Sequence, residues 1–332
     1  MNDHARADER LLLALDSHID IPWPEGPDFS EETTRKVDLP KLRRGGIAAA
    51  FFAAFVPQRG RTPDNDAETY QRAIAMLRAI RAMGERPGAR LATTVSEIEA
   101  AWRDGVVAIV PAVENGFATG IDLSRLAEFR ALGARYVTLT HNGHNALADS
   151  ALPRKDLEDR EAEHGGLSPL GREAIAELNR LGMLADVSHA SKTAMLQAAA
   201  LSATPIVATH SCIRALCDHP RNLDDEQLDL LRDVGGVVQI TAVSAFLKAG
   251  AKPEAVTVAD FVDHIDYAVR RIGLPHVGIS SDFDGGGFFS GWNDASESPN
   301  LTAELARRGY GADEIAALWG GNFLRVLRAA EG

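Results

Sequence analysis

Cysteine is scarce in this sequence, with only Cys212 and Cys217 among 332 residues. Their spacing of five positions matches neither the CxxC pair of a zinc ribbon nor a disulfide framework. We therefore expect both thiols to be buried as small apolar side chains. Hydrophobic residues make up 45% of the chain and charged residues 25%, which is typical of a globular protein with a large core.

Basic runs are also missing, and the 47 Asp and Glu residues outnumber the 35 Lys and Arg residues to give a formal net charge of −12. The resulting field repels polyanions, which argues against nucleic acid as a partner. No long apolar run is present either, because the stretch 11–15 is too short for a signal-peptide core or a membrane span. The last segment is an amphipathic, arginine-containing helix rather than an apolar tail, so we expect a cytoplasmic protein with no membrane partner.

The sequence does contain a repeated pattern of short apolar runs. Most of these runs are followed by a polar turn and a segment of helical periodicity. This pattern is typical of repeated βα units. The expected strands are 11–15, 49–55, 106–113, 136–139, 184–187, 205–208, 237–240 and 277–279. The expected helices are 68–83, 124–132, 169–181, 192–201, 225–233, 258–272 and 313–330.

Eight strands in this arrangement favour an α/β fold of the (β/α)8 TIM-barrel type. We expect one catalytic domain over residues 1–332, with loop insertions near 57–66 and 146–167. A doubly wound sheet is the competing architecture. It is disfavoured because no Gly-rich nucleotide fingerprint follows the first strand.

Side chains able to bind a metal follow several expected strands, at ends that converge in a barrel. His18 and Asp20 are two positions apart, so an extended segment points both to the same side. Glu114 follows the third strand, and its carboxylate could bridge two cations. His189 and His210 follow the fifth and sixth strands and would complete a nitrogen and oxygen site suited to zinc.

Acid and base candidates follow two other strands. His141 lies just after the fourth strand, and Asp282 and Asp284 lie after the eighth. We favour Asp282 because it is nearer the strand, whereas Asp284 would cap the Gly-rich turn. Arg221 is either an ordinary solvated arginine or a clamp for a substrate carboxylate, and its planar guanidinium suits the second role.

Any one of these histidines, taken alone, is better explained as a structural residue. Their coincidence at successive strand ends favours a functional site. The remaining histidines that we assign no role are His4, His164, His219, His264 and His276.

Taken together, these motifs resemble the renal or membrane dipeptidases and their bacterial relatives in the amidohydrolase superfamily, over nearly the whole chain. The motifs that carry the resemblance are Asp16-Ser-His18-Ile-Asp20, Glu114-Asn-Gly116, Leu139-Thr-His141-Asn142, Asp186-Val-Ser-His189, Thr209-His210-Ser211, Arg221-Asn222, Gly278-Ile-Ser-Ser-Asp282-Phe-Asp284-Gly285 and Gly320-Gly-Asn322.

The resemblance implies a dipeptidase with two zinc ions per chain. In such a centre His18 and Asp20 hold one ion, His189 and His210 hold the other, and Glu114 bridges them. It also implies that Asp282 sits beside the first ion and the bridging water, and from that place we expect it to take up the proton of the nucleophile and return it to the leaving amine.

The same resemblance implies that His141 binds the developing oxyanion and that Arg221 holds the terminal carboxylate of the substrate. Small dipeptides are the implied substrates, including those with a D-residue at the carboxyl end, and some relatives open β-lactam rings slowly. A homodimer is a further expectation. The mammalian members are secreted and lipid-anchored, so their location is not transferred to this chain.

Two rival functions are kept. The first is another amidohydrolase reaction on a lactone, β-lactam, phosphoester or nucleobase. Many such centres use a carboxylated lysine as the bridge, yet no lysine stands at an expected strand end and Glu114 fills that place. The second is a non-catalytic metal-binding barrel, which would favour a closed four-ligand site.

Overall fold

The structure is a computed structural model that describes residues 12–21 and 26–332. Its paired strands are parallel and follow the order β1, β2, β4, β5, β6, β7, β8, β9, while β3 pairs with β4 outside this path. The strands are β1 (Ala14–Asp20), β2 (Ile47–Phe55), β3 (Ala89–Leu91), β4 (Val107–Glu114), β5 (Tyr136–Thr138), β6 (Leu184–Asp186), β7 (Val207–Ser211), β8 (Val237–Ile240) and β9 (Val277–Ile279).

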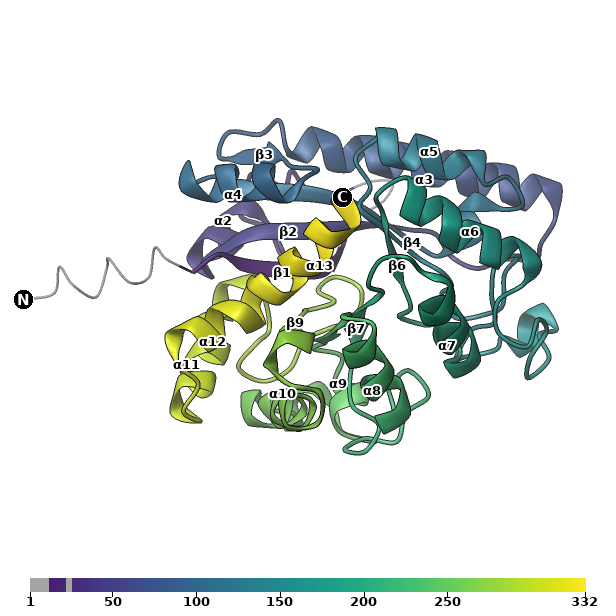
Figure 1. Ribbon diagram of the computed structural model, residues 1–332. Coiled ribbons are helices and arrows are strands. Elements are labelled where there is room, and N and C mark those ends of the chain that lie inside the picture. Colours follow the sequence, from purple (N-terminus) through teal and green to yellow (C-terminus); the bar gives the residue numbers. More distant parts are fainter. Residues whose placement is uncertain (1–11, 22–25) are drawn as a thin grey trace, which may run out of the picture.

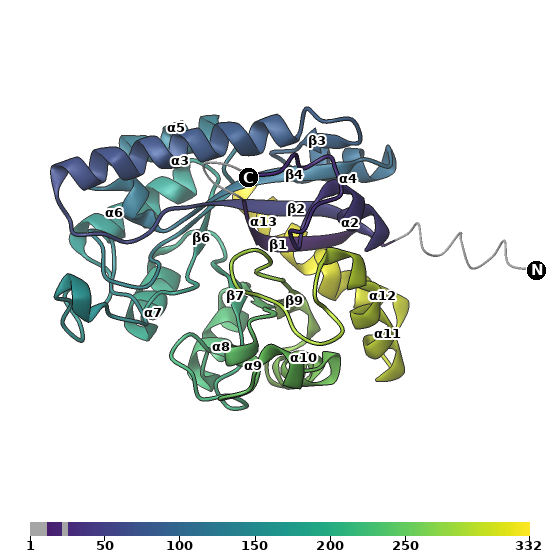
Figure 2. The same cartoon turned by 180° about the vertical axis from the view of Figure 1, so that it is seen from behind.

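The eight-stranded path nearly closes into a barrel because the chain after β9 returns to β1. Asp20 N donates a hydrogen bond to Phe283 O over 3.0 Å, and Asp282 N donates to His18 O over 3.1 Å. Figure 2 shows this returning segment beside β1. The predicted (β/α)8 barrel is confirmed.

Helices surround the strands, with α3, α5 and α6 along one side and α8 and α10 along another (Figure 1). None of the helices within the described ranges is both long enough and apolar enough to cross a membrane. The α-helices are α2 (Leu39–Arg44), α3 (Pro63–Met83), α4 (Val95–Arg103), α5 (Ser124–Ala131), α6 (Pro169–Arg180), α7 (Lys192–Leu201), α8 (Asp225–Asp233), α9 (Ser244–Leu247), α10 (Val258–Ile272), α11 (Pro299–Arg307), α12 (Ala312–Ala316) and α13 (Asn322–Glu331).

The helices begin where the sequence supplies capping residues. Ser168 Oγ accepts a hydrogen bond from Gly171 N at 2.9 Å, and Pro169 occupies the first turn of α6. Thr257 and Asp260 form a reciprocal capping box at the start of α10. The bounds of α7, α8 and α10 are those predicted from the sequence.

Helix α3 begins earlier than predicted, which shortens the loop expected near 57–66. Thr62 Oγ1 accepts a hydrogen bond from Asn65 N at 3.3 Å, and Pro63 stands in the first turn. The polar first turn therefore belongs to the helix rather than to the loop. Strand β3 and helices α2, α4, α9 and α11 were not expected from the sequence.

Strand β1 extends further than the expected 11–15, and residue 11 lies outside the described residues. Asp16, Ser17 and His18 are buried within this strand. Ser17 Oγ donates a hydrogen bond to Thr209 O over 3.0 Å, so this polar side chain is paired inside the barrel. Apolar alternation therefore fails as a strand signal here because the carboxyl end of the barrel is polar.

The opposite, amino-terminal end of the barrel is filled by apolar side chains from α13. Phe323 packs edge to face against Phe51 of β2, with ring centroids 5.1 Å apart. Figure 1 shows α13 crossing in front of β1 and β2. This packing leaves the carboxyl end of the strands as the place for a site.

The single helix expected over 313–330 is interrupted by a π-turn at 317–321. Gly320 lies in this turn against β1, where an added Cβ would be 2.5 Å from Leu13 O. Glycine is therefore required for the close approach of the two backbones.

Candidate metal and active site

All eight residues predicted to form the site lie at the carboxyl end of the barrel. Most are held on strands or within three residues of a strand end, so the barrel fixes their positions. They are His18 and Asp20 on β1, Glu114 at the end of β4, His141 after β5, His189 after β6, His210 on β7, Arg221 in the loop after β7, and Asp282 after β9.

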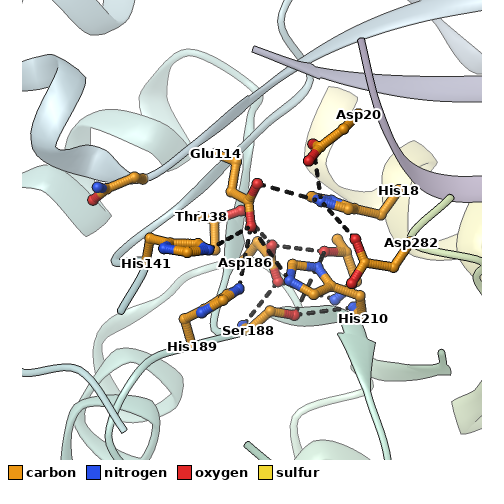
Figure 3. Close-up of polar contacts among 12 residues, drawn as sticks. His18, Asp20, Glu114, Thr138, His141, Asp186, Ser188, His189, His210 and Asp282 are labelled. Carbon is orange, nitrogen blue, oxygen red and sulfur yellow. Dashed lines mark hydrogen bonds and ion pairs between the residues drawn. The ribbon is translucent and has the colours of Figure 1, made fainter. Parts of the chain in front are cut away.

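Glu114 lies at the centre of this group (Figure 3). Its Oε1 is 3.2 Å from His189 Nε2 and 3.5 Å from His210 Nε2. Its Oε2 is 3.5 Å from His18 Nε2. The two carboxylate oxygens therefore face two different sets of imidazoles.

Two further carboxylates lie on the His18 side of Glu114. Asp20 Oδ1 is 3.9 Å and Asp282 Oδ1 is 4.0 Å from His18 Nε2. Three acidic groups thus converge on one buried imidazole, and burial together with repulsion between the carboxylates raises the pKa of Asp20 and of Asp282 when no cation is bound.

The charges of these groups respond to burial and to each other. Burial alone would raise the pKa of Glu114, but His18 and His189 hold it well below its usual range. Burial lowers the pKa of both His189 and His210 well below the usual imidazole range, and neighbouring positive charge adds to the effect. Burial opposes the charge of His18 too, yet Glu114 and the nearby aspartates raise its pKa to about 10. In the metal-free protein His18 therefore balances Glu114, while His189 and His210 keep free lone pairs.

The far nitrogen of each of these imidazoles has its own hydrogen-bond partner. His18 Nδ1 lies 2.8 Å from the hydroxyl of Tyr136, which itself donates to Ser17 O. His189 Nδ1 lies 3.0 Å from Asn142 Oδ1. Such partners fix the ring orientation and leave Nε2 as the coordinating atom, as is usual for metal-binding histidines.

Several ligand atoms lack any other partner. Within residues 12–21 and 26–332, His18 Nε2, His210 Nε2 and Asp20 Oδ1 are buried without a hydrogen bond. Burial of an unpaired polar atom costs roughly 1–3 kcal/mol, and a bound cation would remove that cost. The mixed nitrogen and oxygen donors suit zinc. Two groups have all their ligand atoms within 4.8 Å of one another: His18, Glu114 and His210, and Glu114, His141 and His189.

Backbone conformation is unusual at two of the site residues. His189 has φ 66° and Asp282 has φ 58°, which is the left-handed region that side chains other than glycine rarely adopt. Ser150 Oγ contacts the carbonyl oxygens of His141 and His189 at 2.6 and 3.2 Å. The surrounding structure thus holds His189 in a conformation that it would not favour alone.

His141 and Arg221 lie at the edge of the Glu114 cluster. His141 Nε2 is 4.0 Å from Glu114 Oε1, and its ring rests against Phe55 with centroids 4.7 Å apart. Arg221 is buried, and its Nη2 donates to His210 O at 3.2 Å. Burial lowers the pKa of Arg221 to about 10, so it stays charged at neutral pH. The solvated-arginine interpretation is wrong.

Sequence reasoning missed residues that support the site from behind. Tyr136, Asp186 and Thr209 are buried and hydrogen-bonded close to the candidate ligands. Asp186 was visible as a lone acid ending an apolar strand. Nothing local distinguished Tyr136 or Thr209 from ordinary barrel residues.

Two of the histidines that were given no role, His264 and His276, are hydrogen-bonded away from this cluster, whereas His219 Nδ1 accepts a hydrogen bond from Arg221 N at 3.2 Å. His264 is buried and contacts Ile213 N and Leu247 O, each at 3.1 Å. His276 Nδ1 lies 2.8 Å from Gly236 O. His4 lies outside the described residues.

Comparisons with known proteins identify dipeptidases as relatives, which is consistent with this site geometry. A sequence profile of the membrane dipeptidase family (peptidase family M19) matches residues 5–332. Dipeptidase verJ of Clonostachys rogersoniana is 34% identical over 335 residues, covering 96% of this chain and 84% of its own length. Dipeptidase 3 of Rattus norvegicus is 34% identical and covers 100% of this chain and 68% of its own length.

Solved structures are similar over nearly the full chain. The probable dipeptidase PvdM from Pseudomonas aeruginosa has a TM-score of 0.94 at 33% identity, covering 99% of this chain and 98% of its own. A metallo peptidase from Rhodobacter sphaeroides, solved with a phosphinate mimic of the dipeptide L-Ala-D-Ala, has a TM-score of 0.83 at 26% identity. That match covers 96% of this chain and 99% of the other.

Proposed function

This chain belongs to the membrane dipeptidase family, peptidase family M19, and we propose that its site binds two Zn²⁺ ions and hydrolyses the peptide bond of dipeptides. Membership of the family makes the chain a metallo-dipeptidase. The observation that carries the zinc proposal is the central Glu114, whose two oxygens face separate imidazoles.

Glu114 would bridge the ions by giving one oxygen to each. On the Oε2 side, His18 and Asp20 would hold the first ion; on the Oε1 side, His189 and His210 would hold the second. Proximity alone groups His210 with His18, but we assign it by the Glu114 oxygen that it faces, because a bridging carboxylate divides its oxygens between the metals. When bound, the ions would polarise the scissile carbonyl and lower the pKa of water.

The chain's other site residues would do the proton transfer and the binding. Asp282, beside His18, would accept the proton of the attacking water and return it to the leaving amine. His141 would donate a hydrogen bond to the oxygen that becomes negative. Arg221 would bind the terminal carboxylate of the substrate, since its charge is buried next to the ligands.

This arrangement favours dipeptides over longer peptides. A buried guanidinium is matched by a free carboxylate one residue beyond the scissile bond, whereas a longer peptide would bring an uncharged amide there. We also propose that a D-residue is accepted at the carboxyl end, because a relative binds a mimic of L-Ala-D-Ala. A cytoplasmic location and a homodimer remain predictions from the sequence.

A kinetic screen of the zinc-loaded enzyme tests this function. The substrates are L-Ala-L-Ala, L-Ala-D-Ala and D-Ala-D-Ala, and the matched controls are L-Ala-D-Ala amide and L-Ala-D-Ala-L-Ala. We expect the free dipeptides to be cleaved and both controls to be poor, since neither places a carboxylate at Arg221. A lactone, a β-lactam, a phosphotriester and a nucleoside complete the panel, and faster turnover of any of these would overturn the proposal.

A further inference from the structure

We propose that Asp186 acts through Thr209 as a positioning relay that orients His210 and strengthens its Nε2 as a metal ligand. The inference rests on the proposed function, because it concerns the ion on the Oε1 side of Glu114. Asp186 and Thr209 touch neither substrate nor metal in this account. They act only through His210.

The Asp186 carboxylate is fully buried and accepts four hydrogen bonds from neutral groups. Its Oδ1 accepts from Ser188 N and Thr209 N, each at 3.0 Å. Its Oδ2 accepts from Thr138 Oγ1 at 2.6 Å and Thr209 Oγ1 at 2.7 Å. Figure 3 shows Asp186 below Glu114, with Thr138 and Ser188 around it. Neutral donors thus hold a negative charge directly behind the candidate metal site.

The direction of the hydrogen bonds follows from the number of available protons. Thr209 has one hydroxyl proton, and an ionised Asp186 can only accept it. The oxygen of Thr209 must then accept from His210 Nδ1, which lies 2.9 Å away. His210 is therefore protonated at Nδ1, and its Nε2 lone pair lies 3.5 Å from Glu114 Oε1. The chain of bonds selects the tautomer that can bind a metal.

Neighbouring side chains on a strand normally point to opposite faces, which would separate Thr209 from His210. Strand β7 has a register irregularity between Ala208 and Ser211, and this allows the two side chains to meet. The local distortion of β7 is thus used to build the relay.

The two other imidazoles have weaker support. The chain behind His18 passes through Tyr136 and ends on the carbonyl of Ser17. His189 is held by the neutral amide of Asn142. Of these three described imidazoles, His210 alone is backed by a carboxylate. A carboxylate in this place raises the basicity of a metal-binding histidine, and its loss typically weakens metal affinity by about 10–100-fold.

A merely structural role for Thr209 must be separated from the relay. Its bonds to Asp186 also join β6 to β7, so Thr209→Val could act through the fold alone. The matched control is Thr138→Val, which removes a bond to the same oxygen, Asp186 Oδ2, without touching an imidazole. Thr209→Ser keeps the hydroxyl and should restore the wild-type behaviour.

The experiment measures zinc affinity of metal-free wild type and variants by competition with a chromophoric chelator, together with the Tm of each metal-free protein. We expect Thr209→Val to lower the affinity for one of the two zinc ions by about 10–100-fold. Thr138→Val should leave both zinc affinities unchanged although its Tm falls. If Thr209→Val does not fold, Asp186→Asn takes its place with the same expected loss.

A second readout is the tautomer of His210 in the metal-free protein, from its ¹⁵N chemical shifts. The wild type and Thr209→Ser should show the Nδ1-protonated form, and Thr209→Val should show a mixture. Equal zinc affinities in the wild type and Thr209→Val, or equal losses in Thr209→Val and Thr138→Val, would overturn the relay. Absence of zinc binding by the wild type would instead overturn the proposed function.

Discussion

Asp282 faces His18 across the site, with Asp282 Oδ1 4.0 Å from His18 Nε2. Asp284, two positions later, is turned to a different neighbourhood. Its carboxylate accepts hydrogen bonds from Lys36 N at 3.0 Å and Val37 N at 3.2 Å, and it pairs with Arg35 at 2.8 Å. The two aspartates of one motif therefore have separable tasks.

Asp282→Asn should abolish most activity while zinc stays bound. The amide keeps the shape of the side chain but cannot accept the proton, so kcat should fall by about 10²–10⁴. Asp284→Asn is the matched control. It should mainly lower stability, on the order of 1 kcal/mol, because it weakens the attachment of the 35–37 segment. Measuring kcat, zinc content and Tm for both variants distinguishes the roles, and a fully active Asp282→Asn enzyme would mean that another group moves the proton.

In the metal-free protein, Asp282→Asn should increase stability at high pH. Burial raises the pKa of Asp282 to about 7, against the opposing effect of His18. The folded state therefore binds this proton more tightly than the unfolded chain, and stability falls as pH rises from about 4 to about 7. Removing the charge should stabilise the metal-free protein above pH 7, on the order of a few kcal/mol.

Urea denaturation in the presence of a chelator at pH 4.5 and pH 8 measures this effect. The advantage of Asp282→Asn should be small at the lower pH and large at the higher one. A wild-type protein that is the more stable of the two at pH 8 without metal would contradict the assigned charge state.

Gly285→Ala should damage the site without distorting the backbone. An added Cβ would clash with Asp282 Oδ1 and lie 2.7 Å from Asp20 Oδ2. Both carboxylates would have to move, so we expect lower zinc affinity and a fall in kcat of at least about tenfold. Gly60→Ala, at an open position whose nearest atom would be 3.8 Å from the Cβ, controls for the general effect of the substitution. Wild-type kcat and zinc affinity in Gly285→Ala would contradict the geometry.

Arg221→Met should remove the preference for a free carboxylate. A buried charge that loses its partner typically costs about 2–5 kcal/mol, so kcat/KM for L-Ala-D-Ala should fall by at least about 30-fold. Turnover of L-Ala-D-Ala amide should change little, because it never made that contact. If both substrates lose the same factor, Arg221 supports His210 through their 3.2 Å hydrogen bond rather than binding substrate.

The sequence predicted the barrel because several of its strands and helices obey local rules. Strands β8 and β9 and helices α7, α8 and α10 have the predicted bounds. Each is an apolar or amphipathic segment with a polar turn or capping residue beside it. Strand β1 was placed wrongly because its second half is polar and buried at the site.

The candidate ligands could be identified because histidine and carboxylate residues are uncommon at the ends of apolar strands. Their supporting residues could not. Tyr136 contacts His18 across 118 positions of sequence. The Thr209 hydroxyl supports the site only because Asp186, on the neighbouring strand β6, accepts its hydrogen bond. Such contacts depend on strand order and on the irregularity in β7, which a single sequence does not reveal.

The most direct test of the dinuclear zinc centre is a titration of the metal-free enzyme with Zn²⁺, following hydrolysis of L-Ala-D-Ala and bound metal together. We expect activity to rise until two zinc ions are bound per chain and then to level off. Full activity with one ion or with none would contradict the bridging role assigned to Glu114.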